Sequence, residues 1–294
     1  MDYRTLTVDR LLRAGLRRAP GGWRLTLDPA FQGLPETAHG GCLLAVVHAL
    51  AGAPPAALAR ARCLRRVPLG VPLAVTLEDG LGGWTCRLAL AEAPAQALVD
   101  GAVERADPRG SGAPPGPSPP AAPVALHPTA TPLPISTTCF ACGRDNPVGL
   151  RAALACDATA VAGTWQPRPP LVTADGTLAP VALTALLDEA AFWLGALATG
   201  ESGLTTELAV RLHGAVAADR ALLVGGRRAD ARRRAADPRY VDTAVAAWTA
   251  EGTLVAEAWI TFVAVRGAAR RLVAWMRDVN PPEVLRRVFP AYAA

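Results

Sequence analysis

An approximate repeat of one element order in the two halves of the chain is the feature that most constrains its fold. Residues 40–52 and residues 180–200 are apolar enough to predict buried helices, and each follows a strand-like stretch, at 21–31 and at 150–167. Runs with strand character come after each helix, at 57–67, 72–80, 84–93 and 96–106, and again at 204–213, 219–227, 240–249 and 253–265. The sequence therefore predicts an internal duplication of an α+β unit with one strand, one helix and four further strands.

A segment rich in proline, glycine, serine and alanine separates the two halves, at residues 107–134. It has no hydrophobic period and cannot bury enough apolar surface to order itself, so it predicts a semi-extended linker. A length of 294 residues suits two domains of about 100–150 residues each. We expect an N-terminal domain over 1–106, a C-terminal domain over 135–266 and a helical tail over 267–294 that docks without chemistry through Trp275, Met276, Leu285 and Phe289.

Localisation and macromolecular partners are constrained by what the chain contains. The N-terminal stretch, residues 1–20, has no apolar core of signal-peptide length, and no run approaches the roughly 18 consecutive apolar residues of a membrane span. The six cysteines of this long chain therefore predict reduced thiols and a cytoplasmic protein without a membrane partner. The net charge is +5, with arginines clustered at 227–228 and 232–234. Such a cluster can meet nucleic acid or a polyphosphate ligand, but a solvated turn between strands is the simpler interpretation, and we expect no nucleic acid partner.

The turn before the first helix reads His39-Gly40-Gly41. A helix that starts on glycine can bring unpaired backbone N–H groups against a ligand atom, and the positive end of the helix dipole favours negative charge there. This turn is therefore a candidate oxyanion hole, although the same tripeptide also suits a plain helix start.

The second helix carries Asp188 and Glu189 in an otherwise apolar stretch. A buried acid is costly unless it is hydrogen-bonded or functional, and burial raises its pKa toward the range of a useful base. Adjacent helical residues point about 100° apart, so we expect at most one of the pair to face a given site. The alternative is that one acid pairs with an arginine and the other is solvated.

Several of these motifs together resemble the hotdog-fold acyl-CoA thioesterases. The stretch FQGLPETAHGGCLLAVV (31–47) is similar to the turn that enters that family's central helix, and ALLDEA (185–190) is similar to the acid on the helix. CFACGRDNPVGL (139–150) resembles the entry segment of one subgroup, and TTELAVRLHGAV (205–216) resembles the strand after the helix. The resemblance covers about 139–265 in the second half and, more weakly, about 22–106 in the first. It implies two tandem hotdog domains, each an antiparallel sheet wrapped around one long helix, paired as a pseudo-dimer.

In that family the acid lies nine residues after the histidine, and each site takes its glycine turn from one unit and its acid from the other. Here position 188 lies nine residues after Ala179, and His48 lies nine residues after His39. The resemblance therefore implies one composite site with His39, Gly40 and Gly41 from the first half and Asp188 from the second, completed by the hydroxyl of Thr205 or Thr206. The other turn, Ala179-Pro180-Val181, faces His48 and would be a degraded copy, because Pro180 has no N–H to donate.

The expected reaction is hydrolysis of an acyl-CoA or similar acyl thioester. The carbonyl oxygen would accept a hydrogen bond from the Gly40 N–H, with Gly41 as a second candidate donor, while Asp188 attacks the carbonyl or activates a water molecule. His39 would shape the turn, and we expect Gln32, Gly41, Glu189, Arg227 and Arg228 to contact the substrate, with Arg65 and Arg66 as further candidates for the CoA phosphates. CoA enters only as part of the substrate, so no cofactor is expected, and the protein would be a monomeric pseudo-dimer or a homodimer of double hotdogs.

Two other functions fit the same residues. A non-catalytic acyl-CoA or lipid-binding module is favoured by the degraded second turn and by His48. A hydratase or dehydratase ranks lower, because such sites normally use an Asp/His pair, and no such pair is close in the sequence.

The pair Cys139 and Cys142 is a C-x-x-C motif. Structural zinc needs four ligands, and only Cys156 lies nearby in the sequence to add to this pair. We therefore expect no metal site, and the resemblance implies that this segment caps the domain.

Overall fold

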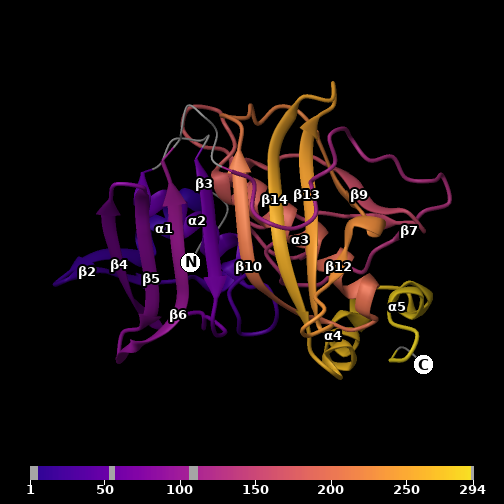
Figure 1. Ribbon diagram of the computed structural model, residues 1–294, viewed down its shortest axis with the longest axis horizontal. Helices are drawn as coiled ribbons and strands as arrows, with labels where there is room; N and C mark the ends of the chain where they lie inside the picture. Colours follow the sequence, from indigo (N-terminus) through magenta and orange to yellow (C-terminus); the bar gives the residue numbers. More distant parts are fainter. Residues whose placement is uncertain (1–5, 53–56, 106–111, 293–294) are drawn as a thin grey trace.

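The computed structural model describes residues 6–52, 57–105 and 112–292. Within these residues, 14 strands form one sheet, and every adjacent pair of strands in it is antiparallel. Figure 1 views this sheet face on, with the first half of the chain on one side, the second half on the other and the long helices behind the strands. The order of the strands is β1-β2-β4-β5-β6-β3-β10-β14-β13-β11-β9-β8-β7, and β12 pairs with β13.

The first half places five strands of the sheet around helix α2. A short helix and an edge strand, α1 and β1, precede this unit and were not predicted. Thr7 caps α1 by accepting a hydrogen bond from the Arg10 N–H. The elements are α1 (Val8–Gly15), β1 (Leu16–Ala19), β2 (Gly22–Thr26), η2 (Pro29–Phe31), α2 (Gly40–Ala51), β3 (Leu58–Cys63), β4 (Pro72–Gly80), β5 (Gly83–Leu90) and β6 (Ala93–Glu104).

The second half wraps further strands around helix α3. The expected strand over 150–167 is in fact two short strands, because the Asp157 carboxylate accepts hydrogen bonds from the Thr159 and Ala160 N–H groups and turns the chain between them. The elements are β7 (Thr131–Pro132), β8 (Ala155–Cys156), β9 (Ala160–Trp165), η3 (Pro169–Leu171), α3 (Pro180–Thr199), β10 (Gly203–Leu212), β11 (Leu222–Arg227), η4 (Arg228–Asp230), β12 (Arg232–Arg233), β13 (Tyr240–Thr249) and β14 (Leu254–Ala264).

The two halves use the same strand order. In each, the strand before the helix lies next to the second strand after it, and the first strand after the helix closes the far side: β2-β4-β5-β6-β3 and β9-β11-β13-β14-β10. The closing strands β3 and β10 pair with each other, from Leu58 opposite Arg211 to Arg62 opposite Glu207. The sheet therefore continues across the boundary between the halves.

Helices α2 and α3 form the core, and both are apolar around most of their circumference. Helix α3 is long and apolar enough to span a membrane, but 83% of its apolar window is buried inside the protein by the sheet and by α2. Each helix ends at a glycine with positive φ, Gly52 at 56° and Gly200 at 72°, which is the usual conformation after the last turn. The burial of these helices explains why the sequence lacks a clear polar face at either one.

The first turn of α2 lies very close to α3. A Cβ atom at Gly41 would lie 2.5 Å from both the Thr184 carbonyl oxygen and the Ala185 Cα. The Thr184 hydroxyl also donates a hydrogen bond to the Gly41 carbonyl, over 2.8 Å. The second glycine of the His-Gly-Gly turn therefore lets the two halves approach, and this approach brings the residues of α3 to the start of α2.

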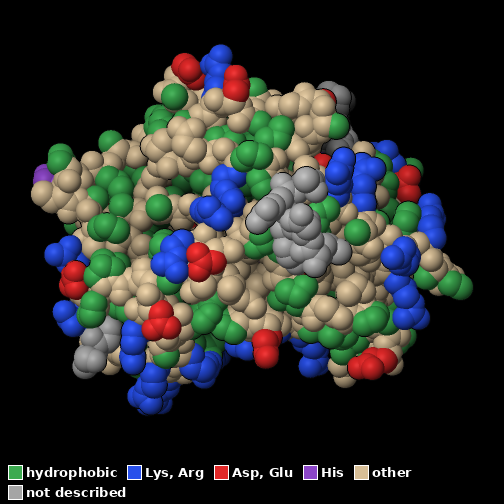
Figure 2. All heavy atoms as spheres, turned by 180° about the vertical axis from the view of Figure 1, so that it is seen from behind, with side chains coloured by type: hydrophobic (Ala, Val, Ile, Leu, Met, Phe, Trp, Pro, Cys, Tyr) green, Lys and Arg blue, Asp and Glu red, His purple; other side chains and the backbone are tan. Residues whose placement is uncertain are grey.

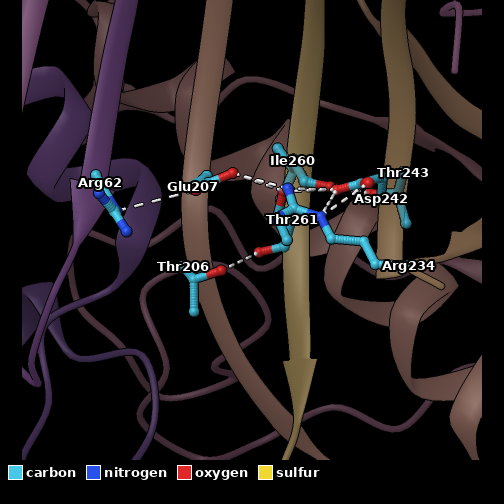
Figure 3. A network of polar contacts seen from close by, with 8 residues as sticks. All are labelled: Arg62, Thr206, Glu207, Arg234, Asp242, Thr243, Ile260 and Thr261. Carbon is cyan, nitrogen blue, oxygen red and sulfur yellow. Dashed lines mark hydrogen bonds and ion pairs between the residues drawn. The ribbon is translucent and has the colours of Figure 1, made fainter. Parts of the chain in front are cut away.

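A polar network lies on the outer face of the sheet, across the boundary between the halves (Figure 3). The Arg234 guanidinium donates to the carboxylates of Glu207 and Asp242 and to the Thr261 hydroxyl, at 2.8–2.9 Å. Arg62 on β3 lies 4.0 Å from the other oxygen of Glu207. One member of the arginine cluster seen in the sequence is thus an internal partner of the sheet.

Only part of the expected linker over 107–134 lies among the described residues. From residue 112 it runs without helix or strand until β7, whose two residues pair with β8. Residues 107–111 lie outside the described part of the chain.

The C-terminal tail packs beside α3 as α4 (Ala268–Met276), η5 (Arg277–Val279) and α5 (Pro282–Val288). Glu201 holds its start by accepting hydrogen bonds from the N–H groups of Gly267 and Ala269 and from the Tyr292 hydroxyl. Asn280 exchanges two hydrogen bonds with the backbone of Ile135. The predicted anchors Met276, Leu285 and Phe289 are buried and Trp275 is half-buried.

Candidate active site between the two halves

A cavity of about 300 Å³ opens where the first turn of α2, the middle of α3, strand β10 and the tail helix α4 meet. Its polar end is lined by His39, Gly40, Asp188, Glu189 and Thr205. Its walls are largely apolar and aromatic, and they include Phe192, Trp193, Leu272, Trp275 and Met276. The cavity therefore combines a small polar centre with a larger apolar volume, as ligand sites usually do.

The His39-Gly40-Gly41 turn forms the start of α2, and its glycines begin the helix itself. His39 is the N-cap residue, and its carbonyl oxygen accepts hydrogen bonds from the Cys42 and Leu43 N–H groups. None of the described residues accepts a hydrogen bond from the Gly40 N–H, which is one of the orphan donors of a helix N-terminus. Gly40 lines the cavity, so this donor and the positive helix end are available to a bound oxygen atom.

Asp188 reaches this turn from the other half of the chain. Its Oδ2 accepts a hydrogen bond from the Gly41 N–H over 2.9 Å and lies 3.2 Å from His39 Nδ1. Its Oδ1 accepts a hydrogen bond from the Thr205 hydroxyl over 2.7 Å. A Cβ atom at Gly40 would lie 2.8 Å from Oδ2, so glycine at position 40 leaves room for the carboxylate. The structure thus brings together His39, Gly40, Asp188 and Thr205, as the resemblance implies.

Burial controls the protonation of this group. Desolvation raises the pKa of Asp188 above its ordinary value, although the charge of His39 and the hydrogen bonds from Thr205 and Gly41 act in the opposite direction. Burial disfavours the charged imidazole, but contacts with Glu189 and Asp188 outweigh it and raise the pKa of His39 to about 9. The acid and the imidazole therefore form a buried pair rather than two independent groups.

Glu189 also lines the cavity, contrary to the expectation that only one acid of the pair would face the site. Its Oε1 accepts a hydrogen bond from the Trp193 indole over 2.8 Å, and its Oε2 lies 4.0 Å from His39 Nε2. Both carboxylates face the same site because the His39 ring lies between them, with Nδ1 toward Asp188 and Nε2 toward Glu189.

Gly41 differs from its predicted role. Its N–H group is 2.9 Å from Asp188 Oδ2 and 3.2 Å from His39 Nδ1, so it is already occupied inside the protein. Gly41 therefore orients Asp188 and allows the helices to approach, while the Gly40 N–H has no acceptor among the described residues.

Thr205 and Thr206 are separated by the structure. Both line the cavity, but only the Thr205 hydroxyl contacts Asp188. The Thr206 hydroxyl donates to the Thr261 carbonyl oxygen over 3.2 Å, within the sheet (Figure 3). The structure thus selects Thr205 between the two alternatives.

Besides Gly41, three of the predicted substrate contacts do not line the cavity. Gln32 donates to the Thr138 hydroxyl and accepts from the Glu36 N–H, which holds the loop before the His-Gly-Gly turn. Arg227 ends β11, and Arg228 donates to the Asp157 carbonyl oxygen on the far side of the second half. Arg65 and Arg66 do line the cavity and provide its positive charge. Figure 2 shows the rear face of the molecule, on which arginine side chains lie in separate groups rather than in one continuous patch.

The turn at the start of α3 has the features expected of the second copy. Ala179 is the N-cap of α3 and makes no capping hydrogen bond through its side chain, and Pro180 occupies the first turn of the helix. His48 is buried near the end of α2.

The segment 138–149 is the part of the site whose role in the structure the sequence did not reveal. The Phe140 N–H donates to the Gln32 carbonyl over 2.6 Å, and the Asn146 side chain donates to the Ala30 carbonyl over 2.8 Å. These bonds tie the second half to the loop of the first half and carry Cys139 and Cys142 to the cavity wall. The C-x-x-C spacing singled out these cysteines, but nothing in the sequence placed them beside His39.

The tail also differs from expectation, because it contributes to the site. Leu272, Trp275 and Met276 of α4 form part of the cavity wall. Their apolar pattern indicated only that the tail would dock, since periodicity does not say which surface lies opposite.

No protein-family model matches the sequence, and no curated protein matches it. Solved structures are similar over most of the chain. A candidate thioesterase from Novosphingobium aromaticivorans superposes with a TM-score of 0.57 and 19% identity, covering 85% of this chain and 98% of that one. Acyl-CoA thioesterase II TesB2 from Mycobacterium marinum superposes with a TM-score of 0.52 and 15% identity, covering 85% and 95%. A protein of unknown function with a hotdog fold from Alicyclobacillus acidocaldarius gives a TM-score of 0.53 and 13% identity, covering 88% and 99%. The chain therefore has a hotdog-type fold, and its structural neighbours include thioesterases.

Proposed function

We propose that this protein hydrolyses an acyl-CoA or a similar acyl thioester at a single site between its two halves. The observation that carries the proposal is the meeting of the glycine turn of α2 with Asp188 of α3, at 2.9 Å, on the wall of a largely apolar cavity. The fold of the neighbouring structures supports it, since several of them are named as thioesterases.

The Gly40 N–H would bind the oxygen of the thioester carbonyl. This donor lies at the positive end of α2, so it favours the negative charge that develops on the oxygen as the carbonyl is attacked. The helix is held rigidly against α3 by the contact at Gly41, so the donor does not have to reorganise during the reaction.

Asp188 would act as the nucleophile or as the base that activates a water molecule. Burial raises its pKa and so strengthens it as a base, while the Thr205 hydroxyl and the Gly41 N–H fix the orientation of the carboxylate. When water is the nucleophile, its proton passes to Asp188, its oxygen bonds to the carbonyl carbon, and the thiolate of CoA leaves as the C–S bond breaks.

The remaining features suit the two ends of such a substrate. The acyl group would occupy the apolar wall formed by Phe192, Trp193 and the tail residues. Arg65 and Arg66 would receive the phosphates of CoA at the rim, in place of the predicted Arg227 and Arg228.

We also propose that the chain is a fused pair of hotdog domains, from one ancestral unit present twice. The shared strand order of the two halves and the pairing of β3 with β10 support this organisation. In such a protein the domains 1–106 and 135–266 take the place of two subunits. We propose a cytoplasmic enzyme that works as a monomer or as a homodimer of such chains.

Asp188→Asn tests the reaction. We expect the variant to lose about 10²–10⁴-fold in the rate of thiol release from acyl-CoA substrates, because the amide cannot accept the proton. It should still bind acyl-CoA, as measured by the thermal shift that the ligand causes. The matched control is Asp219→Asn, at an exposed position outside the cavity, which should keep the parent rate.

The outcomes separate the proposal from its rivals. Equal thiol release by the parent and by Asp188→Asn would refute the mechanism. Binding of acyl-CoA without any thiol release by the parent would indicate the non-catalytic module instead.

A hydratase or dehydratase is the second candidate, and one observation favours it more than the sequence did. It ranked lower because no Asp/His pair is close in the sequence, but His39 and Asp188 lie 3.2 Å apart in space, from opposite halves. Incubation with enoyl-CoA tests this candidate: hydration of the double bond, with the thioester intact, would support it over hydrolysis.

A further inference from the structure

A second group of side chains occupies the polar end of the cavity, next to the proposed reaction centre. His39, Cys139 and Glu189 each contribute one potential ligand atom, and these three atoms lie within 4.8 Å of one another. All three residues are buried and all three line the cavity. They come from the first turn of α2, from the segment before β8 and from the middle of α3, so only the folded chain assembles them.

The spacing of the group fits a bound ion better than direct contact. His39 Nε2 and Glu189 Oε2 are 4.0 Å apart, which is too long for a hydrogen bond. In a tetrahedral zinc site the metal–ligand bonds of about 2.0–2.3 Å separate neighbouring ligand atoms by about 3.3–3.8 Å. The Trp193 indole occupies Glu189 Oε1 and leaves Oε2 directed at the group. A small contraction would bring these atoms into coordinating range.

The surroundings orient each of these side chains. His39 presents Nδ1 to the Asp188 carboxylate at 3.2 Å, so the imidazole can direct Nε2 at an ion, which is the usual carboxylate–histidine arrangement beside zinc. The Cys139 sulfur accepts a hydrogen bond from the Ala141 N–H over 3.3 Å, which stabilises a thiolate. The turn is tight: a Cβ atom at Gly143 would lie 2.2 Å from the Cys139 carbonyl oxygen, so only glycine fits there.

The balance of charge points in the same direction. Two carboxylates and a thiol surround the single imidazole of His39, and all of them are removed from water. A divalent cation would offset the negative charge that burial leaves poorly compensated.

We propose that His39 Nε2, Cys139 Sγ and Glu189 Oε2 bind a zinc ion, with the fourth position open to the cavity. Sulfur, imidazole nitrogen and carboxylate oxygen together are a typical zinc donor set. Binding would release the protons of Nε2 and of the thiol. This site departs from the expectation of no metal, which considered only Cys156 as a further ligand. It does not depend on the proposed hydrolysis.

Zinc content and affinity test the proposal directly. The full-length protein, freed of metal with a chelator, is titrated with Zn²⁺ in competition with a chromophoric chelator, and its metal content after purification is measured by mass spectrometry. We expect about one equivalent of zinc per chain. With Co²⁺ as the probe, we expect a thiolate-to-cobalt charge-transfer band, which reports a cysteine ligand in the parent protein without any substitution.

Variants assign the ligands. Cys139→Ser and Glu189→Gln should each weaken zinc binding by at least about 100-fold, since loss of even an outer partner costs about 10–100-fold. Cys139→Ser should also abolish the cobalt band. Cys156→Ser is the matched control, because it removes another buried cysteine that does not line the cavity, and it should keep both the affinity and the band. Circular dichroism verifies that each variant is folded.

Absence of stoichiometric zinc and of the cobalt band in the parent would overturn the proposal, as would equal affinity in the parent, Cys139→Ser and Glu189→Gln. Asp188→Asn keeps the three ligands, so zinc bound by an Asp188→Asn protein that no longer hydrolyses thioesters would support both proposals separately.

Discussion

Replacing Gly41 by alanine tests how the two halves are held together. In the first turn of an ordinary helix this change is favourable by roughly 0.5–1 kcal/mol, because alanine loses less backbone entropy than glycine. Here the added Cβ atom would lie 2.5 Å from the Thr184 carbonyl oxygen and from the Ala185 Cα. Ordinary contact begins at 3.4 Å, so the substitution needs a relative movement of α2 and α3 approaching 1 Å. Both obstacles are backbone atoms, and no side chain can turn aside to make room.

Overpacking of a core costs about 1–3 kcal/mol, and the upper end applies where backbone must move. Displacement of α2 also stretches the Gly41 N–H hydrogen bond to Asp188 and the Thr184 hydroxyl bond to Gly41, each worth about 1 kcal/mol. After subtraction of the helix preference, we expect a net loss of about 2–4 kcal/mol in the free energy of unfolding. At about 2–4 °C per kcal/mol for a chain of this class, the Tm should fall by roughly 4–16 °C.

Urea denaturation of the parent and of Gly41→Ala, followed by tryptophan fluorescence, measures this loss. Gly82→Ala is the matched control, because a Cβ atom there would meet no atom within 4 Å, so its stability should stay within about 0.5 kcal/mol of the parent. Thioester hydrolysis by Gly41→Ala should fall as well, since Asp188 loses its alignment with Gly40. A Gly41→Ala protein as stable as Gly82→Ala would refute the argument that this glycine permits the approach of the helices.

Three further predictions concern the acid, the tail and the cavity. Thr205→Val should lower the kcat of thioester hydrolysis about 10–100-fold, because the hydrogen bond to Asp188 is charge-assisted and worth about 1.5–3 kcal/mol. Thr206→Val loses only a hydrogen bond to Thr261 and should keep a kcat close to that of the parent. Glu201→Gln should lower the Tm at neutral pH, measured by differential scanning fluorimetry: burial raises the pKa of Glu201, but hydrogen bonds with Tyr292, Gly267 and Ala269 outweigh it and hold the pKa below its ordinary value. A carboxylate of depressed pKa stabilises the fold above its unfolded pKa of about 4.3 and loses that contribution as the pH falls through the folded pKa. The difference in Tm between the parent and Glu201→Gln should therefore disappear in acid, and a difference that grows in acid would contradict this prediction. Trp275→Ala enlarges the cavity and should move the preference in kcat/KM toward longer acyl chains, by up to roughly fourfold for each methylene buried at about 0.8 kcal/mol. Trp84→Ala, outside the cavity, should leave this preference unchanged.

The order of the elements could be predicted from the sequence with good accuracy. The strand runs at 72–80 and 240–249 coincide with β4 and β13, and the two apolar segments are the helices α2 and α3. Hydrophobic periodicity and the positions of glycine and proline are local signals, and these elements are long enough for the signals to be clear. Elements held mainly by their neighbours, such as β1 and the paired strands β7 and β8, gave no such signal because two to four residues carry no period.

That the site takes residues from both halves was implied by the resemblance to the hotdog thioesterases, in which a spacing of nine residues relates His39 to His48 and Ala179 to Asp188. Pattern and spacing identify which residue types a site has lost or kept. They do not say which atoms of those residues meet.

Only the tertiary structure decided the partners of each group. In the structure the Gly41 N–H donates to Asp188, and the Thr206 hydroxyl donates to a carbonyl oxygen of the sheet. Arg227 and Arg228 lie outside the cavity, and Cys139 lies beside His39 and Glu189. Local sequence determines helices and strands because their hydrogen bonds and periods lie within a few residues. The site depends on contacts between residues more than a hundred positions apart, and those contacts exist only once α2 and α3 pack against each other at the distance that Gly41 allows.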